Sequence, residues 1–206
     1  MNDRGFIHHF IPAAQSPARR VLLLLHGTGG NEDDMIPLGR DLDPAAALLS
    51  LRGNVLENGM PRFFRRRAEG VFDEEDVVRR AHELADFVGT AAARYEFDPK
   101  NLTAVGYSNG ANIAAAVLLL RPGVLTRAIL FRAMVPITPA TQPNLVKTRA
   151  LICSGTHDPI IPVDNVERLA AMLRAAAADV TLRFGNAGHQ LVFAEIEAAK
   201  NWLRES

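Results

Sequence analysis

Short apolar runs alternate with amphipathic segments along this chain. Residues 21–25 (VLLLL) contain no polar position, which is typical of a strand covered on both faces. The segment 73–94 instead places Val77, Ala81 and Leu84 on one helical stripe. The pattern predicts strands over 6–13, 21–25, 45–51, 102–105, 127–135, 149–154 and 180–184. It predicts helices over 31–42, 73–94, 109–120, 163–178 and 191–204. This alternation predicts an α/β fold, with helices on both faces of a mostly parallel sheet of about seven strands.

The longest irregular segment in this pattern covers residues 52–70 and mixes aromatic with basic side chains. Long loops inside a compact domain are usually functional or disordered. A polar turn is expected over 15–19, and a proline-rich connection over 136–144. With these connections, the 206 residues are expected to form a single α/β domain over 1–206.

Composition argues against several classes of function. The 23 basic and 23 acidic residues balance, so the total charge points to neither nucleic acid nor an acidic membrane as a partner. The longest nearly apolar stretch, 111–120, is too short to span a bilayer, and the first residues carry no signal-peptide pattern. The single cysteine, Cys153, cannot form an internal disulfide and is expected to be a small buried apolar residue. We expect a soluble cytoplasmic protein.

A serine between two glycines stands where a strand is predicted to turn into a helix. The segment 106–110 (GYSNG) has the pattern of a nucleophile elbow. Side chains at Gly106 and Gly110 would clash in so tight a turn. The helix that follows points its first N–H groups toward the place where negative charge develops when Ser108 attacks a carbonyl. The alternative is a small-residue turn that only packs the helix on the strand.

Serine becomes a good nucleophile only when a base takes its proton. Of the six histidines, His189 follows the last predicted strand on a loop that can reach Ser108, and we predict that it is the base. A carboxylate must orient the other ring nitrogen, and Asp158 stands at another strand end. Asp164 starts a helix and Asp179 lies at the far end of its strand, so both are weaker candidates. The alternatives are a helix-start residue for His189 and an ordinary Asp-Pro turn for Asp158.

The glycine-rich segment 27–30 follows a buried strand and can bring backbone N–H groups close to a ligand. We predict an oxyanion hole made by the backbone N–H groups of Thr28 and Asn109, with a plain turn as the alternative for Thr28. His26 is expected to brace this loop by hydrogen bonds. The histidines and the cysteine show no metal-ligand spacing, so we expect neither a metal nor a cofactor.

These motifs resemble those of the carboxylesterase/phospholipase family of α/β-hydrolases, which includes acyl-protein thioesterases. The likeness rests on LHGTGG at 25–30, GYSNG at 106–110, GTHDPIIP at 155–162 and GH at 188–189. It covers about residues 6–202 and is closest to bacterial predicted or hydroquinone-associated carboxylesterases. The resemblance implies a serine carboxylesterase of α/β-hydrolase fold, acting on short-to-medium esters through an acyl-enzyme on Ser108. The chain order Ser108, Asp158, His189 is the order expected of that fold.

The sequence departs from acyl-protein thioesterases in two places. Those enzymes carry a tryptophan-containing loop where this chain has residues 62–67, and a small polar motif where it has 132–136. Both segments border the acyl pocket, so a preference for thioesters does not carry over. Three alternatives remain: an acyl-protein thioesterase or lysophospholipase-type hydrolase, an acyltransferase or C–C bond hydrolase on the same triad, and a non-catalytic binding module. Dienelactone hydrolases share the fold but use a cysteine at the position of Ser108.

The wall of the substrate pocket is less well specified. Phe63, Phe64, Met134 and Ile161 are apolar residues near the expected strand ends and are predicted to line it, with core packing as the alternative for each. Three interpretations stay open for the arginines at 65–67. They are contact with an acidic substrate, a solvated face, and a subunit contact in a homodimer, of which the last two are favoured.

Overall fold

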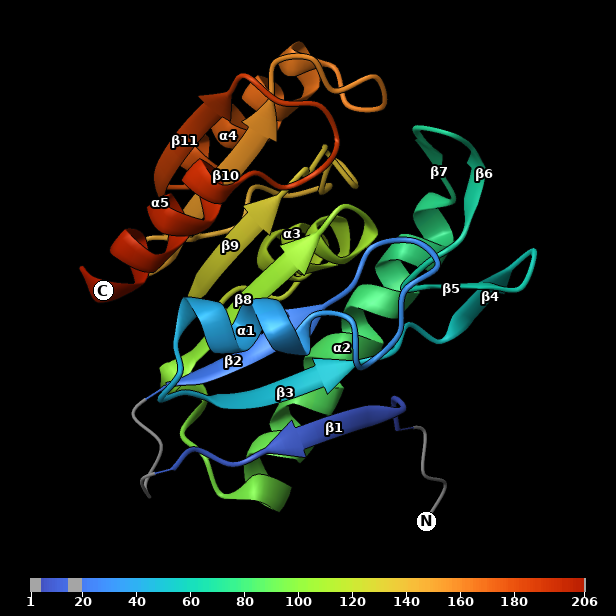
Figure 1. Ribbon diagram of the computed structural model, residues 1–206. Helices are drawn as coiled ribbons and strands as arrows, with labels where there is room; N and C mark the ends of the chain where they lie inside the picture. The colour runs from blue at the N-terminus through green and yellow to red at the C-terminus, as the bar shows by residue number, and fades with distance from the viewer. Residues whose placement is uncertain (1–4, 15–19, 206) are drawn as a thin grey trace.

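The computed structural model describes residues 5–14 and 20–205, and a seven-stranded sheet forms its centre (Figure 1). The strand order is β1-β3-β2-β8-β9-β10-β11. The strands are β1 (His8–Ile11), β2 (Val21–Leu25), β3 (Ala47–Leu51), β8 (Leu102–Tyr107), β9 (Arg127–Phe131), β10 (Arg149–Gly155) and β11 (Asp179–Gly185). All neighbours pair in parallel except β1, which runs antiparallel to β3 at the edge. The predicted mostly parallel sheet is confirmed.

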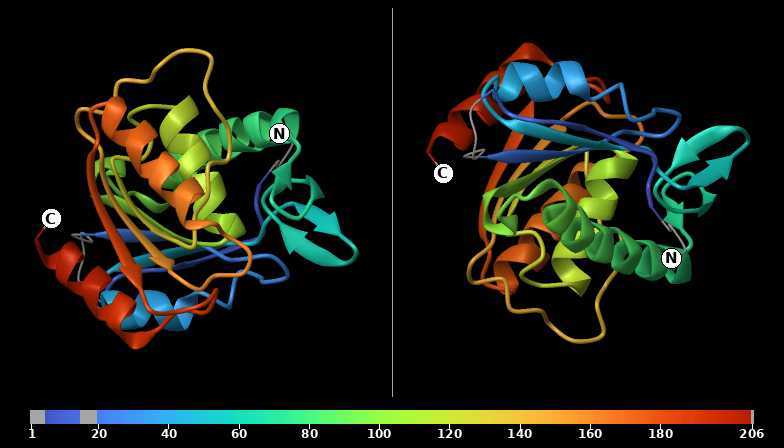
Figure 2. Two further views of the ribbon diagram at one scale, coloured as in Figure 1. Left: turned by 90° about the horizontal axis from the view of Figure 1, so that it is seen from above. Right: turned by 90° about the horizontal axis from the view of Figure 1, so that it is seen from below.

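Helices cover both faces of this sheet, as Figure 2 shows from two sides. They are α1 (Ile36–Leu42), α2 (Glu74–Tyr95), α3 (Asn109–Leu120), α4 (Val163–Ala175) and α5 (Phe193–Arg204), with a short 3₁₀ turn at Pro99–Asn101. Helices α1 and α5 pack on one face, where Leu24 and Trp202 belong to one apolar cluster. Helices α2, α3 and α4 pack on the other, where Leu84 and Ile113 belong to a larger one. No helix in the described part of the chain is long and apolar enough to cross a membrane.

Several predicted elements have different ends in the structure, and local contacts or backbone conformation account for three of them. Helix α1 begins at Ile36 rather than Asn31, because the Asn31 side chain accepts a hydrogen bond from the Asp33 amide (2.7 Å) and holds a turn there. Strand β9 ends at Phe131, since Arg132 takes a left-handed conformation (φ 58°). Helix α4 stops at Ala175, shortly before Ala177 at φ 69°. The turn predicted over 15–19 lies outside the described residues.

The segment predicted to be irregular, 52–70, forms most of two short hairpins, so that prediction was wrong. Strand β4 (Val55–Glu57) pairs with β5 (Met60–Arg62), and β6 (Arg66–Ala68) pairs with β7 (Val71–Phe72). The first turn is Asn58-Gly59, with φ of 53° and 79°, the left-handed pair that a two-residue hairpin turn requires. Both hairpins lie at the end of the molecule toward which the parallel strands point (Figure 1).

Cys153 lies on β10 and is fully buried, as predicted. Burial raises the pKa of its thiol to about 12, so the sulfur stays protonated at neutral pH. A protonated, enclosed thiol is a poor nucleophile, and Cys153 therefore acts as a small apolar residue of the core.

Candidate functional site

Ser108 sits in the predicted strand-to-helix turn, between β8 and α3. Its backbone has φ 52° and ψ −114°, a conformation that side chains rarely adopt and that sharp functional turns keep. A Cβ atom on Gly106 would stand 2.6 Å from Cα of Ala111, and one on Gly110 would stand 2.0 Å from the Leu25 carbonyl oxygen. No real Cβ atom approaches that closely, so both positions require glycine. The two glycines allow the turn that raises Ser108 above the sheet.

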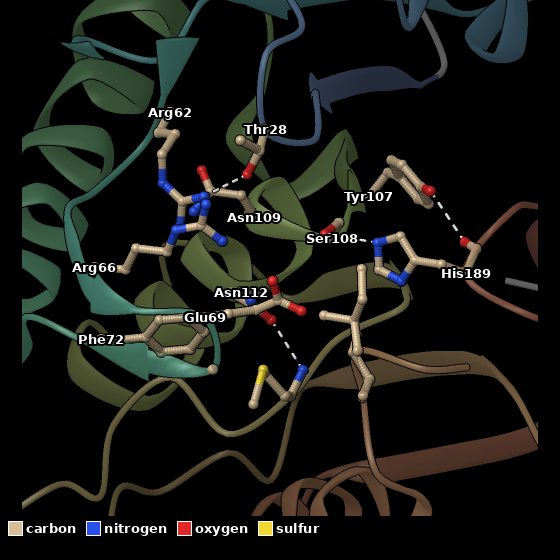
Figure 3. Close-up of a pocket in the computed structure, with 14 residues that line it drawn as sticks. Thr28, Arg62, Arg66, Glu69, Phe72, Tyr107, Ser108, Asn109, Asn112 and His189 are labelled. Atoms are coloured by element: carbon tan, nitrogen blue, oxygen red, sulfur yellow. Dashed lines mark hydrogen bonds between the residues drawn. The ribbon is translucent and has the colours of Figure 1, made fainter. Parts of the chain in front are cut away.

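The structure brings together Ser108, His189 and Asp158, three residues from separate strand ends. Nε2 of His189 lies 3.1 Å from the Ser108 hydroxyl, and Nδ1 lies 2.8 Å from Oδ2 of Asp158 (Figure 3 shows the first contact). The Asp158 side chain has no exposed surface, and its Oδ1 accepts from the amides of Ile160 (2.8 Å) and Ile161 (3.2 Å). A carboxylate only accepts, so Nδ1 carries the proton and Nε2 is free to accept from the serine hydroxyl.

The loops that carry Asp158 and His189 are tied together by backbone hydrogen bonds. The Thr156 amide donates to the Gly185 carbonyl (2.9 Å), and the His157 amide donates to the Ala187 carbonyl (3.0 Å). These bonds continue the parallel pairing of β10 with β11 past the last strand residues. The relative position of the carboxylate and the imidazole is therefore set by the sheet.

A second set of contacts holds the His189 loop from beneath, through three consecutive carbonyls. Nε of Arg132 donates to the Gly188 carbonyl (2.9 Å), the Tyr107 hydroxyl to the His189 carbonyl (3.0 Å), and Nη2 of Arg132 to the Gln190 carbonyl (2.5 Å). Burial raises the pKa of the Tyr107 phenol, which keeps its proton available for this bond. The position of the imidazole is thus fixed both by the contacts to the backbone of its loop and by the hydrogen bond to Asp158.

Arg132 itself is fully buried and forms a two-pronged ion pair with Glu195 of α5 (2.6 and 2.8 Å). The same Glu195 carboxylate accepts from the Val192 amide (3.1 Å) at the start of that helix. Sequence reasoning missed this pair, because arginine is seldom fully buried and the partner lies 63 residues away. The pair joins the His189 loop to the helix behind it.

Breaking this buried pair should cost much more stability than breaking a surface pair. Arg132→Met leaves the Glu195 charge without its partner, and we expect the free energy of unfolding to fall by about 3–5 kcal/mol. Arg121→Met is the control, since Arg121 pairs with the exposed Asp86 (2.9 Å), and it should cost less than about 1 kcal/mol. Urea denaturation of the two variants measures both values. Equal losses would show that the Arg132–Glu195 pair does not hold this part of the fold.

Two backbone N–H groups near Ser108 are free of hydrogen bonds within the described part of the chain. Among the described residues, neither the Thr28 amide nor the Asn109 amide has a hydrogen-bond partner. The loop that carries Thr28 is braced by His26, whose Nε2 accepts from the Gly53 amide (3.0 Å) while Nδ1 lies 2.6 Å from the Gly27 carbonyl. Burial lowers the pKa of His26, so its ring is neutral, with the proton on Nδ1. This is the bracing contact that the sequence predicts.

A cavity of about 290 Å³ opens beside Ser108 and His189 (Figure 3). Of the four predicted wall residues, Met134 and Ile161 line it, whereas Phe63 and Phe64 do not. Those two rings belong to the core: Phe63 packs on His26 (4.9 Å between ring centroids) and Phe64 on Phe72 (5.0 Å). Arg66 also lines the cavity, and contact with an acidic substrate was one of the three interpretations open for it. Sequence reasoning missed other lining residues, which include Arg62, Glu69, Phe72, Tyr107 and Asn112.

One other cluster gathers groups of the kind that bind metals. Atoms of His9, Glu32 and Asp33 lie within 4.8 Å of one another. Both Glu32 oxygens already bind the Arg52 guanidinium (2.5 and 2.8 Å), and His9 lies 3.0 Å from Asp33. None of the three residues lines the cavity beside Ser108. Together with Arg52, these residues form an ion-pair network in which His9 and Asp33 are exposed and Glu32 is buried.

Residues 7–206 match the phospholipase/carboxylesterase family. The Bacillus subtilis protein MhqD is 49% identical over 186 residues, which cover 90% of this chain and 93% of MhqD. The crystal structure of a Bacillus cereus carboxylesterase is 48% identical and superposes with a TM-score of 0.95 over 98% of this chain and 95% of that one.

A more distant structural relative, YahD, was solved with malic acid. It is 29% identical, with a TM-score of 0.91, and the match covers 98% of this chain and 99% of YahD. The high TM-scores across nearly the whole length confirm the α/β-hydrolase fold that the motifs implied.

Proposed function

Because the chain belongs to the phospholipase/carboxylesterase family of α/β-hydrolases, we propose that it is a serine carboxylesterase that forms an acyl-enzyme on Ser108. The observation that supports this most is the line of contacts from Ser108 through His189 to Asp158, at 3.1 and 2.8 Å. A histidine that accepts from a serine and donates to a buried carboxylate has the hydrogen bonds that activate a nucleophile.

In the first half of the reaction, the Ser108 hydroxyl attacks the ester carbonyl while Nε2 of His189 takes its proton. The Asp158 carboxylate stabilises the resulting imidazolium through Nδ1. The tetrahedral oxyanion is received by the free amides of Thr28 and Asn109, the second at the N-terminus of α3. His189 then gives its proton to the leaving alcohol, and the acyl group stays on Ser108.

In the second half, a water molecule takes the place of the alcohol. His189 removes a proton from the water, hydroxide adds to the acyl carbon, and the same two amides hold the second oxyanion. Collapse of this intermediate returns the proton to Ser108 and releases the carboxylic acid. Every proton moves through Nε2 of His189, so the hold on the His189 loop by Arg132 and Tyr107 supports both halves.

The size of the cavity favours short acyl groups. Its 290 Å³ lies at the small end of ligand pockets, which leaves little room for a long alkyl chain. Malic acid, with which YahD was solved, is a small carboxylic acid. We propose that this chain releases acids of about that size. A lysophospholipase or a long-chain protein thioesterase would need a longer groove than this cavity offers.

A series of p-nitrophenyl esters with acyl groups from acetate to palmitate tests this proposal. We expect kcat/KM to be highest for two to four carbons and to fall by about tenfold or more by eight carbons, because the additional methylenes find no room in a cavity of this size. Release of p-nitrophenol gives the rate for each ester. A rate no higher than that of buffer for every ester would support the non-catalytic binding module, and a preference for palmitate would support the lysophospholipase-type alternative.

A further inference from the structure

The cavity beside Ser108 has a cationic wall. Arg62 of β5 and Arg66 of β6 both line it, and Figure 3 shows their guanidinium groups next to each other on the side opposite His189. The Arg62 side chain is almost wholly buried, with 3% of its surface exposed, and that of Arg66 is mostly buried. Burial, and then the neighbouring Arg66 charge, lower the pKa of Arg62, but a guanidinium stays charged at neutral pH. Two such charges side by side are costly unless an anion meets them.

The Arg62 and Arg66 charges share one carboxylate partner, Glu57, behind the wall. Glu57 lies 3.1 Å from Nε of Arg62 and 2.7 Å from Nε of Arg66, and it does not line the cavity. Nη1 of Arg62 donates to the Thr28 hydroxyl (2.5 Å), while Nη2 has no hydrogen-bond partner among the described residues. The wall therefore keeps one positive charge and free donors beside the loop that carries the Thr28 amide.

From this wall we propose that the esters hydrolysed at Ser108 carry a carboxylate on their acyl part, so that the substrates are half-esters of small dicarboxylic acids. The inference rests on the proposed serine esterase function. The leaving alcohol must lie next to His189, which protonates it, and the acyl part extends across Ser108 to the arginine wall. Guanidinium groups bind carboxylates through paired, charge-assisted hydrogen bonds.

Glu69, in the turn between β6 and β7, is the one acidic side chain that lines the cavity in the described part of the chain. It is exposed, and no hydrogen bond or ion pair to it is found among the described residues. Its charge opposes an anionic acyl group that approaches the wall. Removing the Glu69 charge should therefore raise the preference for an anionic acyl group, whereas removing the Arg66 charge should lower it. These opposite changes separate an electrostatic effect from a loss of shape.

Two esters of similar shape test the proposal: monomethyl succinate, with a terminal carboxylate, and methyl levulinate, with a methyl ketone in its place. The measured quantity is the ratio of their kcat/KM values, from methanol release. For wild type we expect a ratio of about ten or more in favour of the half-ester, the gain typical of a charge-assisted contact. Arg66→Gln should lower the ratio by about tenfold, and Glu69→Gln should raise it about two- to threefold.

Arg67→Gln is the matched control, because Arg67 is an exposed neighbour that does not line the cavity, and its ratio should equal that of wild type. A wild-type ratio of one or less, or an Arg66→Gln ratio equal to that of wild type, overturns the proposal. Folding is checked by comparing the thermal midpoints of the variants. If levulinate is hydrolysed without a preference for succinate, only the carboxylate proposal fails. If neither ester nor any p-nitrophenyl ester is hydrolysed, the esterase function itself fails.

Discussion

Replacing Ser108 with alanine should lower kcat for p-nitrophenyl acetate by about 10⁴-fold or more. The change removes the oxygen that lies 3.1 Å from Nε2 of His189, and no other group in the described cavity wall is a nucleophile held by a base. Members of such a triad act as a unit, so the remaining two residues cannot make up for the loss. The rate that is left reflects the two free amides and the binding of the ester.

A second serine gives a matched control for this change. Ser154 is buried on β10, and its hydroxyl has no hydrogen-bond partner in the described structure. Ser154→Ala removes the same atom without touching the site, and kcat should stay within about threefold of wild type. Both variants should keep the circular dichroism spectrum of the wild type. Near-normal hydrolysis by Ser108→Ala would show that the nucleophile is another group.

Replacing Asp158 with asparagine should lower kcat/KM by about 10²- to 10⁴-fold. Asparagine keeps the shape of the side chain, but the charge that stabilises protonated His189 is lost. An amide NH₂ turned toward Nδ1 would also favour the wrong ring tautomer. The amides of Ile160 and Ile161 still find an oxygen acceptor in asparagine, so the loop should keep its fold. The loss should therefore appear in catalysis.

The two other carboxylates that the sequence offered serve as controls. Asp164 lies in the first turn of α4, where its charge suits the helix dipole, and Asp179 pairs with Arg149 at the start of β11 (3.1 Å). Neither contacts His189, so Asp164→Asn and Asp179→Asn should each stay within about threefold of the wild-type kcat/KM. If Asp158→Asn kept the wild-type kcat/KM while Asp179→Asn lost most of it, the orienting carboxylate would lie at the other end of the sheet.

The sheet and the meeting of the three strand ends were predictable because parallel strands leave strong signals. Buried parallel strands read as continuous apolar runs, such as 21–25, and their carboxyl ends share one edge of the sheet. That rule places Ser108, Asp158 and His189 side by side without any knowledge of loop shapes. It also assigns Asp179 to the opposite edge, where the structure has it.

The walls of the site were harder to predict, because tertiary contacts set them. The Asn58-Gly59 pair is a strong hairpin signal, but the flanking strands have only three residues each and one contains Pro61. Side-chain directions in this segment follow from distant partners, such as the bond from the Phe63 amide to Oδ1 of Asn109 (2.7 Å). Hydrophobicity alone therefore assigned the Phe63 ring to the cavity and missed Arg62.

Covalent labelling tests the central claim, an acyl-enzyme on Ser108, most directly. A fluorophosphonate reacts with a serine that a neighbouring base activates, and it forms a stable phosphonyl ester on that oxygen. After treatment with the probe and proteolysis, mass spectrometry should find the label on the peptide that contains Ser108. The Ser108→Ala and His189→Ala variants should remain unlabelled under the same conditions. A label on another residue, or on Ser108 at the same rate without His189, would contradict the proposed mechanism.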